Sequence, residues 1–229
     1  MRRILIAMVV YLLPGLALAQ VTPRLQSGGK ALLFSFSGLD NLNANSFNGG
    51  FGGKYFLSPT MALRLGVQLA TASQDIPANP PAGLDGQDGK ISGGAWGLNG
   101  ALELHGGTGR VSPFVGLGIA YSTTSTENKD ANIGPASGQT VIKNNPSGET
   151  IGGITFVPGN RFDVFALLGA EFFIVKELSL AAEYRLGFSN IAGKDVEVTQ
   201  GTSSNKFKVG GTSGFGVDTA GVLTLAFYF

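Results

Sequence analysis

Large apolar residues alternate with small or polar ones in several segments of the chain. The clearest segment runs from Met61 to Ala70. One of its faces carries only large apolar residues, namely Met61, Leu63, Leu65, Val67 and Leu69. Because successive side chains of an extended strand point to opposite sides, this period of two predicts a β-strand. The same alternation recurs in Val111–Tyr121, Leu178–Phe188 and Phe215–Phe229.

Four further segments alternate less regularly, which brings the number of predicted strands to eight. They are Ala31–Leu39, Phe47–Leu57, Gly94–His105 and Phe162–Ile174. Short connections alternate with long ones along the chain, so the short turns and the long loops are expected at opposite ends of one antiparallel sheet. The long loops are expected at about 40–46, 71–93, 122–161 and 190–213.

The second face of these strands is small or charged. It combines Gly, Ala and Ser with the charged residues Lys54, Arg64, Glu103, Glu171, Glu183 and Arg185. An eight-stranded barrel has an interior just wide enough for side chains, and it can hold glycines and a few paired charges. A soluble core built from such residues would be poor, so the apolar face is expected to meet lipid.

The predicted fold is therefore all-β: a transmembrane antiparallel up-and-down β-barrel of eight strands, in which every backbone polar group finds a partner. Aromatic residues near the strand ends fit interfacial girdles, with Tyr55 and Phe229 at the short turns and Trp96, Tyr121 and Phe188 at the other end. Thr140–Lys143 and Thr150–Val157 are expected to extend a hairpin beyond the membrane. If they cross the membrane instead, the barrel has ten strands. Eight are preferred because the first of these arms is too polar to face lipid.

The N-terminus has the pattern of a secretory signal peptide. Arg2 and Arg3 precede an apolar run, a Pro-Gly break follows, and the segment ends in Ala17-Leu18-Ala19. Cleavage is expected after Ala19. The predicted organisation is a signal peptide at 1–19, a periplasmic N-terminal segment at 20–29 and a barrel domain at 30–229.

Composition removes several functional classes. The 229 residues include 36 Gly, 1 His and no Cys, which excludes disulfides and cysteine chemistry and disfavours zinc. With 16 basic and 15 acidic residues, the chain has no electrostatic support for binding nucleic acid. No metal ion and no cofactor are expected.

Three motifs resemble the small outer-membrane β-barrels of Gram-negative bacteria, the OmpA/OmpX-type family of porin-like barrel domains. They are the segment Pro113–Tyr121, the triplet Glu183-Tyr184-Arg185 and the C-terminal strand that ends Leu223–Phe229. The resemblance covers about residues 30–229. It implies that Leu223, Leu225, Phe227 and Phe229 form the C-terminal signal read by the barrel-assembly machinery. Members of the family differ widely in role, so the fold does not decide the function.

The inward charges are the main candidate site. Their positions, counted from the short turns, should lie at similar depth near one end of the lumen. The residues are Lys54, Arg64, Glu103, Glu171, Glu183 and Arg185. The favoured interpretation is an ion-paired plug, since an unpaired buried charge would cost several kcal/mol. The alternative is a gated path for protons or small ions.

Catalysis and cation binding have weaker support. His105 and Glu103 share a face, but the sequence offers no serine two residues away, and His105 lies on the predicted periplasmic side. Asp85 and Asp88 form an acidic pair in a long loop that could bind a divalent cation bridging lipopolysaccharide, although a solvated turn is the favoured interpretation.

The expected function is a structural or surface-interaction role for a non-enzymatic, monomeric barrel in the outer membrane. The alternatives are a narrow channel for small or hydrophobic solutes and, with less support, a lipid-modifying enzyme. The expected partners are outer-membrane lipids, lipopolysaccharide and, during biogenesis, the barrel-assembly machinery.

Overall fold

The computed structural model describes residues 25–37, 49–107, 109–135 and 138–229, with the backbone alone for 36–37, 49 and 217–221. The predicted signal peptide, most of the segment at 20–29 and the first long loop lie outside the described residues.

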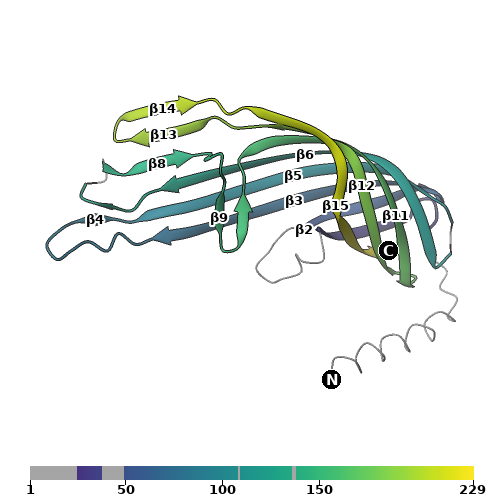
Figure 1. Ribbon diagram of the computed structural model, residues 1–229. Helices are drawn as coiled ribbons and strands as arrows, with labels where there is room; N and C mark the ends of the chain where they lie inside the picture. The colour runs from purple at the N-terminus through teal and green to yellow at the C-terminus, as the bar shows by residue number, and fades with distance from the viewer. Residues whose placement is uncertain (1–24, 38–48, 108, 136–137) are drawn as a thin grey trace, which may run out of the picture.

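Eight strands form a closed antiparallel ring (Figure 1). They are β1 (Lys30–Ser37), β2 (Gly49–Ser58), β3 (Met61–Ile76), β5 (Gly89–His105), β6 (Val111–Lys129), β11 (Gly159–Val175), β12 (Leu178–Ala192) and β15 (Gly211–Tyr228). Each pairs with the next barrel strand along the chain, and β1 closes the ring by pairing with β15. The predicted eight-stranded up-and-down barrel is confirmed.

Three barrel strands are much longer than the alternation predicted. β3, β5 and β6 continue beyond the ring at the long-loop end, and three short strands widen their sheet (Figure 1). The short strands are β8 (Thr140–Lys143), β13 (Val196–Gln200) and β14 (Ser203–Phe207). We call this sheet outside the ring the extension. The sequence pattern ended these strands early because both of their faces become polar there.

β6 is the strand on which barrel and extension separate. It pairs with β11 up to Thr124, and from Glu127 onward it pairs with β8 instead. One wall of the barrel therefore continues as the extension, while β11 and β12 end near the barrel mouth (Figure 1).

The two arms of the third long loop do not pair with each other. Thr140–Lys143 joins the extension as β8, whereas the second arm forms a separate hairpin of β9 (Glu149–Ile151) and β10 (Ile154–Phe156). Ile151 and Phe156 are buried, and Phe156 lies so close to Gly93 that a Cβ there would stand 2.5 Å from its ring. The hairpin thus packs on the lumen side of β5. A small pairing of β4 (Gly86–Gln87) with β7 (Asn132–Ile133) holds the distal loops together.

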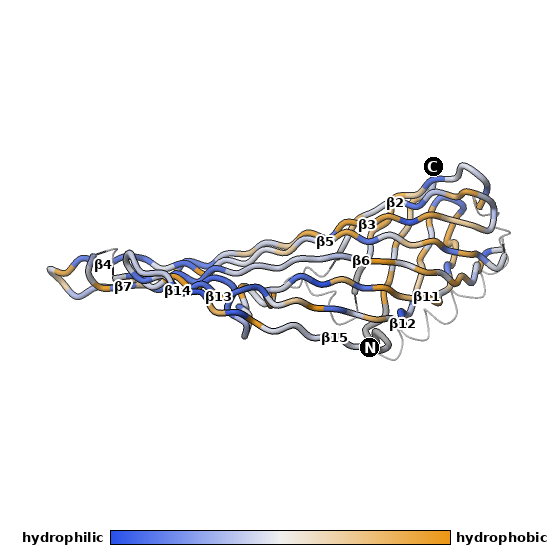
Figure 2. Tube along the Cα trace, turned by 90° about the horizontal axis from the view of Figure 1, so that it is seen from above, coloured by the Kyte–Doolittle hydropathy of each residue, from blue (hydrophilic) through white to orange (hydrophobic). Residues whose placement is uncertain are grey.

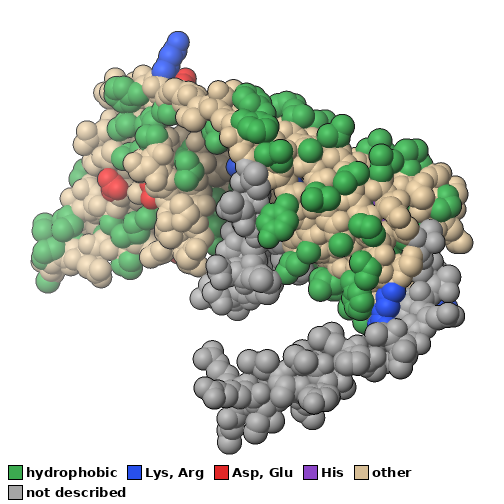
Figure 3. Space-filling model, turned by 45° about the vertical axis from the view of Figure 1, so that its right-hand side comes forward, with side chains coloured by type: hydrophobic (Ala, Val, Ile, Leu, Met, Phe, Trp, Pro, Cys, Tyr) green, Lys and Arg blue, Asp and Glu red, His purple; other side chains and the backbone are tan. Residues whose placement is uncertain are grey.

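The outward face of the barrel is apolar. Orange segments gather at the barrel end in Figure 2, and hydrophobic side chains cover the outer surface in Figure 3. The outward residues of β3 and β6 are typical, with Leu65 and Leu117 58% and 70% exposed. Tyr55 and Phe229 point outward at the short-turn end, and Trp96, Tyr121 and Phe188 at the other. An exposed apolar band between aromatic girdles is the surface of a barrel that spans a bilayer. Within the described residues, no helix has the length and apolarity to cross a membrane.

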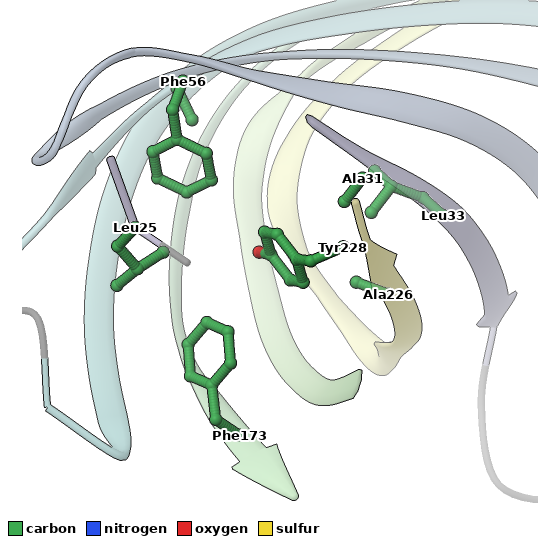
Figure 4. Packing of buried hydrophobic residues seen from close by; sticks show 8 residues of the cluster. Leu25, Ala31, Leu33, Phe56, Phe173, Ala226 and Tyr228 are labelled. Atoms are coloured by element: carbon green, nitrogen blue, oxygen red, sulfur yellow. The ribbon is translucent and has the colours of Figure 1, made fainter. Parts of the chain in front are cut away.

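The inward face differs from the prediction in one respect, because aromatic rings accompany the small and charged residues. A buried cluster at the short-turn end contains Phe56, Phe173 and Tyr228, and Leu25 packs beside them (Figure 4). A second cluster nearer the middle contains Phe114 and Phe165. We call the first cluster the aromatic floor.

Inward glycines make room for these rings. A Cβ at Gly169 would lie 2.5 Å from Cζ of Phe114, and one at Gly118 would lie 2.6 Å from the ring of Phe165. The lumen therefore accommodates aromatic rings because their direct partner on the neighbouring strand carries no side chain at these points.

Candidate functional site

Six inward charged residues form one connected network across the lumen. Its centre is Glu103 on β5, which lies 2.8 Å from Nζ of Lys54 and 2.9 Å from Nη1 of Arg64. The structure brings together all six residues that the sequence indicated: Lys54, Arg64, Glu103, Glu171, Glu183 and Arg185. We call this network the lumen plug.

The other two carboxylates close the network on either side. Glu171 on β11 lies 3.1 Å from Nζ of Lys54, while Glu183 on β12 receives two hydrogen bonds from the Arg64 guanidinium at 2.6 and 3.1 Å. Arg185 donates from Nε to Glu183 at 2.8 Å. The plug thus contains three carboxylates and three cations, so its formal charges cancel.

Neutral side chains satisfy the second carboxylate oxygen of Glu171. Tyr228 donates its hydroxyl hydrogen to Glu171 at 2.6 Å, and Ser179 donates to the same oxygen. Buried carboxylates are tolerated when ion pairs and hydrogen bonds replace their lost hydration. The side chains of Lys54, Arg64 and the three glutamates are at most 6% exposed.

His105 extends the plug toward the short turns and has a partner that sequence reasoning missed. Its Nε2 lies 3.3 Å from Glu103, and its Nδ1 shares a hydrogen bond of 2.9 Å with the hydroxyl of Ser112. No serine lies two residues from His105 on its own strand. Ser112 instead begins the next strand, β6, and the intervening short turn brings it back beside His105.

Each member of this Ser-His-Glu chain is already engaged by other groups. Glu103 already forms ion pairs with Lys54 and Arg64, Ser112 donates its hydroxyl hydrogen to the Gly107 carbonyl at 2.8 Å, and Ser112 is fully buried. A nucleophile must reach a substrate carbonyl, and a lipid has no access to this position in the described structure.

The plug and the aromatic floor together close the short-turn half of the lumen. The rings of Phe56 and Phe114 flank His105 at centroid distances of 5.2 and 5.3 Å, and Nζ of Lys54 lies 5.5 Å from the centroid of Phe114. Aromatic rings are therefore in contact with the polar groups of the plug, as expected in an interior that is filled by side chains.

The other half of the lumen is open and forms a vestibule that the sequence did not indicate. Its cavity has a volume of about 430 Å³ and is lined by residues of β11, β12 and β15, including Phe165, Arg185, Gly214 and Gly216. A polar group stands at its rim: Asp163 lies 2.8 Å from Nε of Arg161 and accepts a hydrogen bond of 2.5 Å from Ser189.

The remaining predicted residues lie apart from the plug. Leu223, Leu225, Phe227 and Phe229 alternate with buried residues at the end of β15, and Phe227 and Phe229 are exposed on the apolar face. Asp88 accepts a hydrogen bond from the backbone of Ala78, as a solvated turn would. Across the described ranges, no group of three or more His, Cys, Asp or Glu residues is placed to hold a metal ion.

Comparisons with known proteins add structural likenesses. No family model and no curated protein matches the sequence. Among solved structures, the chain is similar to the outer membrane protein AlkL in lipid bilayers, with 15% identity, a TM-score of 0.41, and 89% of this chain and 91% of that one covered. It is also similar to the N-terminal β-barrel domain of OprF from Pseudomonas aeruginosa, with 12% identity, coverage of 89% and 98%, and a TM-score of 0.32. A third similar structure is that of CarO from Acinetobacter baumannii, with 12% identity, 90% of this chain and 99% of that one covered, and a TM-score of 0.34.

The class of the protein follows from its own strand ring and from the facing of its side chains. The chain is a transmembrane β-barrel with a plugged lumen and an extension on one wall. The likeness to small outer-membrane barrels that the sequence indicated is also found among the solved structures.

Proposed function

We propose that this barrel is a non-conducting, non-enzymatic anchor that holds the extension at the outer surface of a Gram-negative outer membrane. The observation that carries the proposal is the lumen plug on its aromatic floor, which fills the short-turn half of the lumen with buried side chains. The extension gives the protein a large surface beyond the membrane for structural or binding contacts.

The orientation and the biogenesis belong to the same proposal. Cleavage after Ala19 would release the mature chain into the periplasm, where the outward apolar residues that end at Phe229 serve as the signal for the barrel-assembly machinery. The short turns then face the periplasm and the extension faces outward, because barrels of this class have short periplasmic turns and long outer loops. The mature protein is proposed to be a monomer.

Planar-bilayer recording of the purified full-length barrel tests the proposal. We expect no large and stable conductance from the wild type. The matched control is the double variant Arg64→Ala and Glu103→Ala, which removes one cation and one carboxylate from the centre of the plug and is expected to raise the frequency of open events. A large, stable wild-type conductance would refute the sealed lumen.

The vestibule favours a second candidate, a narrow path for small or hydrophobic solutes. Its cavity reaches down to Arg185, at the upper edge of the plug. A solute could therefore be held in the vestibule above the plug. Uptake into vesicles that is lost in Gly216→Leu, which fills the vestibule, would support this path over the anchor role.

A further inference from the structure

The chain enters the barrel through a tight turn at the short-turn end. The amide of Gly29 donates to the carbonyl of Gln26 at 2.9 Å, which closes a β-turn over residues 26–29. Gly28 has a φ of 83°, a left-handed conformation that glycine adopts readily at the third position of a turn. Leu25 precedes this turn and lies at the end of the ring. We call the segment Leu25–Gly29 the strap.

Leu25 completes the aromatic floor from outside the ring. Its side chain is 5% exposed and belongs to the same buried cluster as Phe56, Phe173 and Tyr228. Those three rings come from β2, β11 and β15, whereas Leu25 precedes the first strand. Figure 4 shows Leu25 facing the same space as the rings. The short-turn end of the lumen is therefore closed in part by a residue that lies outside the ladders of the barrel.

The strap is fastened to the ring much less firmly than the barrel strands are to each other. At the end of β2, Phe56 accepts a hydrogen bond from the amide of Gly28 at 2.8 Å and donates one to the carbonyl of Gly29 at 2.9 Å. Ser27 donates its hydroxyl hydrogen to the carbonyl of Leu57 at 3.1 Å. The ladder between β12 and β15, by contrast, contains 14 residue pairs. A segment with so few contacts opens at a free energy well below that of global unfolding.

Tyr228 connects the aromatic floor to the lumen plug. Its ring centroid lies 5.4 Å from that of Phe173. Its hydroxyl donates to Glu171 at 2.6 Å, and Glu171 in turn pairs with Lys54 at 3.1 Å. This hydrogen bond needs a ring that is held in place, and the packed cluster around the ring holds it. A movement of Leu25 out of the cluster therefore reaches the plug through Tyr228.

We propose that the strap is a gate at the short-turn end of the lumen, which opens while the ring stays folded and loosens the plug through Tyr228. When Leu25 leaves the aromatic floor, water enters beside the Tyr228 ring and its hydroxyl leaves Glu171. The pair of Glu171 with Lys54 is then hydrated and holds the plug less firmly. When Leu25 returns, water is expelled and the hydrogen bond forms again. The inference rests on the sealed lumen of the proposed function.

Single cysteines test whether the strap opens by itself, since the chain has no cysteine of its own. The full-length barrel is folded in micelles and treated with a charged, water-soluble alkylating reagent. Gln26→Cys is the exposed reference, and Ala226→Cys is the buried reference, in the same cluster as Leu25 but on β15. We expect Leu25→Cys to react at least about tenfold more slowly than Gln26→Cys and at least about tenfold faster than Ala226→Cys. A rate equal to that of either reference would overturn the gate.

Planar-bilayer recording tests the link from the strap to the plug. Leu25→Ser is expected to raise the frequency of open events about tenfold or more, because burial of a leucine favours the closed state by at least that factor. Leu57→Ser is the matched control, since it makes the same change on an outward side chain at the same end that is already 44% exposed. It is expected to stay within about twofold of the wild type.

A double variant tests the role of the Tyr228 hydroxyl. Tyr228→Phe keeps the ring and removes only the hydrogen bond to Glu171. In that background, Leu25→Ser should add less than about twofold to the frequency of open events, because both changes act on the same contact. An unchanged frequency in Leu25→Ser alone, or an equal increase with and without the hydroxyl, would overturn the link.

The two kinds of measurement keep the two proposals distinguishable. Alkylation rates need no conductance, and they report on the strap even if Leu25→Ser does not fold. A large, stable wild-type conductance contradicts the sealed lumen of the proposed function. Alkylation of Leu25→Cys at the rate of either reference contradicts the gate alone.

Discussion

The barrel and the extension share three continuous strands, but lipid surrounds the barrel and water surrounds the extension. Within the ring, β3 turns Leu65 outward and Arg64 inward, whereas in the extension it turns Thr71 outward and Ala72 inward. The backbone pairing of β3 with β5 continues from one region to the other without a shift of register. Strand continuity is thus a property of backbone hydrogen bonding, and the surrounding medium decides which side chains each face carries.

The two regions also use charge differently. The plug buries its cations and carboxylates in one neutral network, while the ion pair of the extension, Lys206 with Glu197, is solvated. Burial makes each partner in the plug necessary to the others, because a carboxylate left without its cation has no water to replace it.

Arg64→Ala is expected to have the largest effect. It leaves Glu103 and Glu183 without a shared cation, and loss of one partner from a buried pair costs about 3–5 kcal/mol. The free energy of unfolding, measured by urea titration in micelles, should fall by that amount. Lys206→Ala in the extension should cost less than about 1 kcal/mol. Equal losses for the two variants would mean that the plug is hydrated.

Leu65→Arg tests the outward face of the barrel against that of the extension. An arginine on the lipid face near the midplane costs about 2–4 kcal/mol. Gln68→Arg, which faces the lumen, should be milder. Thr71→Arg, outward on the same strand but above the girdle, should stay within about 0.5 kcal/mol. Unfolding titrations in lipid vesicles measure the free energy of unfolding of each variant. A loss for Thr71→Arg similar to that for Leu65→Arg would mean that the membrane extends beyond Thr71.

Gly169→Val tests how tightly the lumen is packed. The new side chain would overlap both the ring of Phe114 and the backbone carbonyl oxygen of Ala182, and overpacking of this kind costs about 1–3 kcal/mol. Gly216→Val is the matched control, because a Cβ there meets no atom within 4 Å. If both variants lower the unfolding midpoint by the same amount, the loss of stability comes from replacing glycine itself and not from the contacts at position 169.

Phe156→Ala should have the smallest effect on the whole molecule. It removes the ring that holds the β9–β10 hairpin against Gly93, so amide hydrogen exchange in 149–156 should accelerate. The unfolding free energy of the barrel should change by less than about 0.5 kcal/mol. A larger global loss would make the hairpin part of the barrel's cooperative unit.

The barrel itself was predictable because lipid imposes a strict alternation on each strand. The extension was not, because water accepts polar residues on both faces, and Ser73, Gln74 and Asp75 carry no period that marks a strand. The hairpin at 149–156 escaped prediction for a related reason. Its position depends on the contact between Phe156 and Gly93, two residues far apart in the sequence.

The candidate site shows the same division. The six charges of the plug could be found by counting residues from the short turns, since facing and depth follow from strand positions alone. Ser112, Ser179 and Tyr228 could not, because their roles depend on which residues stand opposite them once the strands are paired. The rings of Phe56 and Phe114 lie on the inner face that the alternation assigns them, but the argument from side-chain size did not anticipate aromatic residues there.

The change of partner along β6 has a mechanical consequence. Any pull on the tip of the extension, away from the membrane, acts parallel to β3, β5 and β6, which run unbroken from the barrel wall. The ladder between β3 and β5 and the ladder between β5 and β6 each contain 16 residue pairs, so such a load is shared by many hydrogen bonds in shear at once. β8, β13 and β14 are joined to this wall through three residue pairs with β6 and a few flanking hydrogen bonds, such as that from Asn144 N to Thr126 O, so they would detach first. Under tension, β8, β13 and β14 would separate from the extension before the barrel itself began to open.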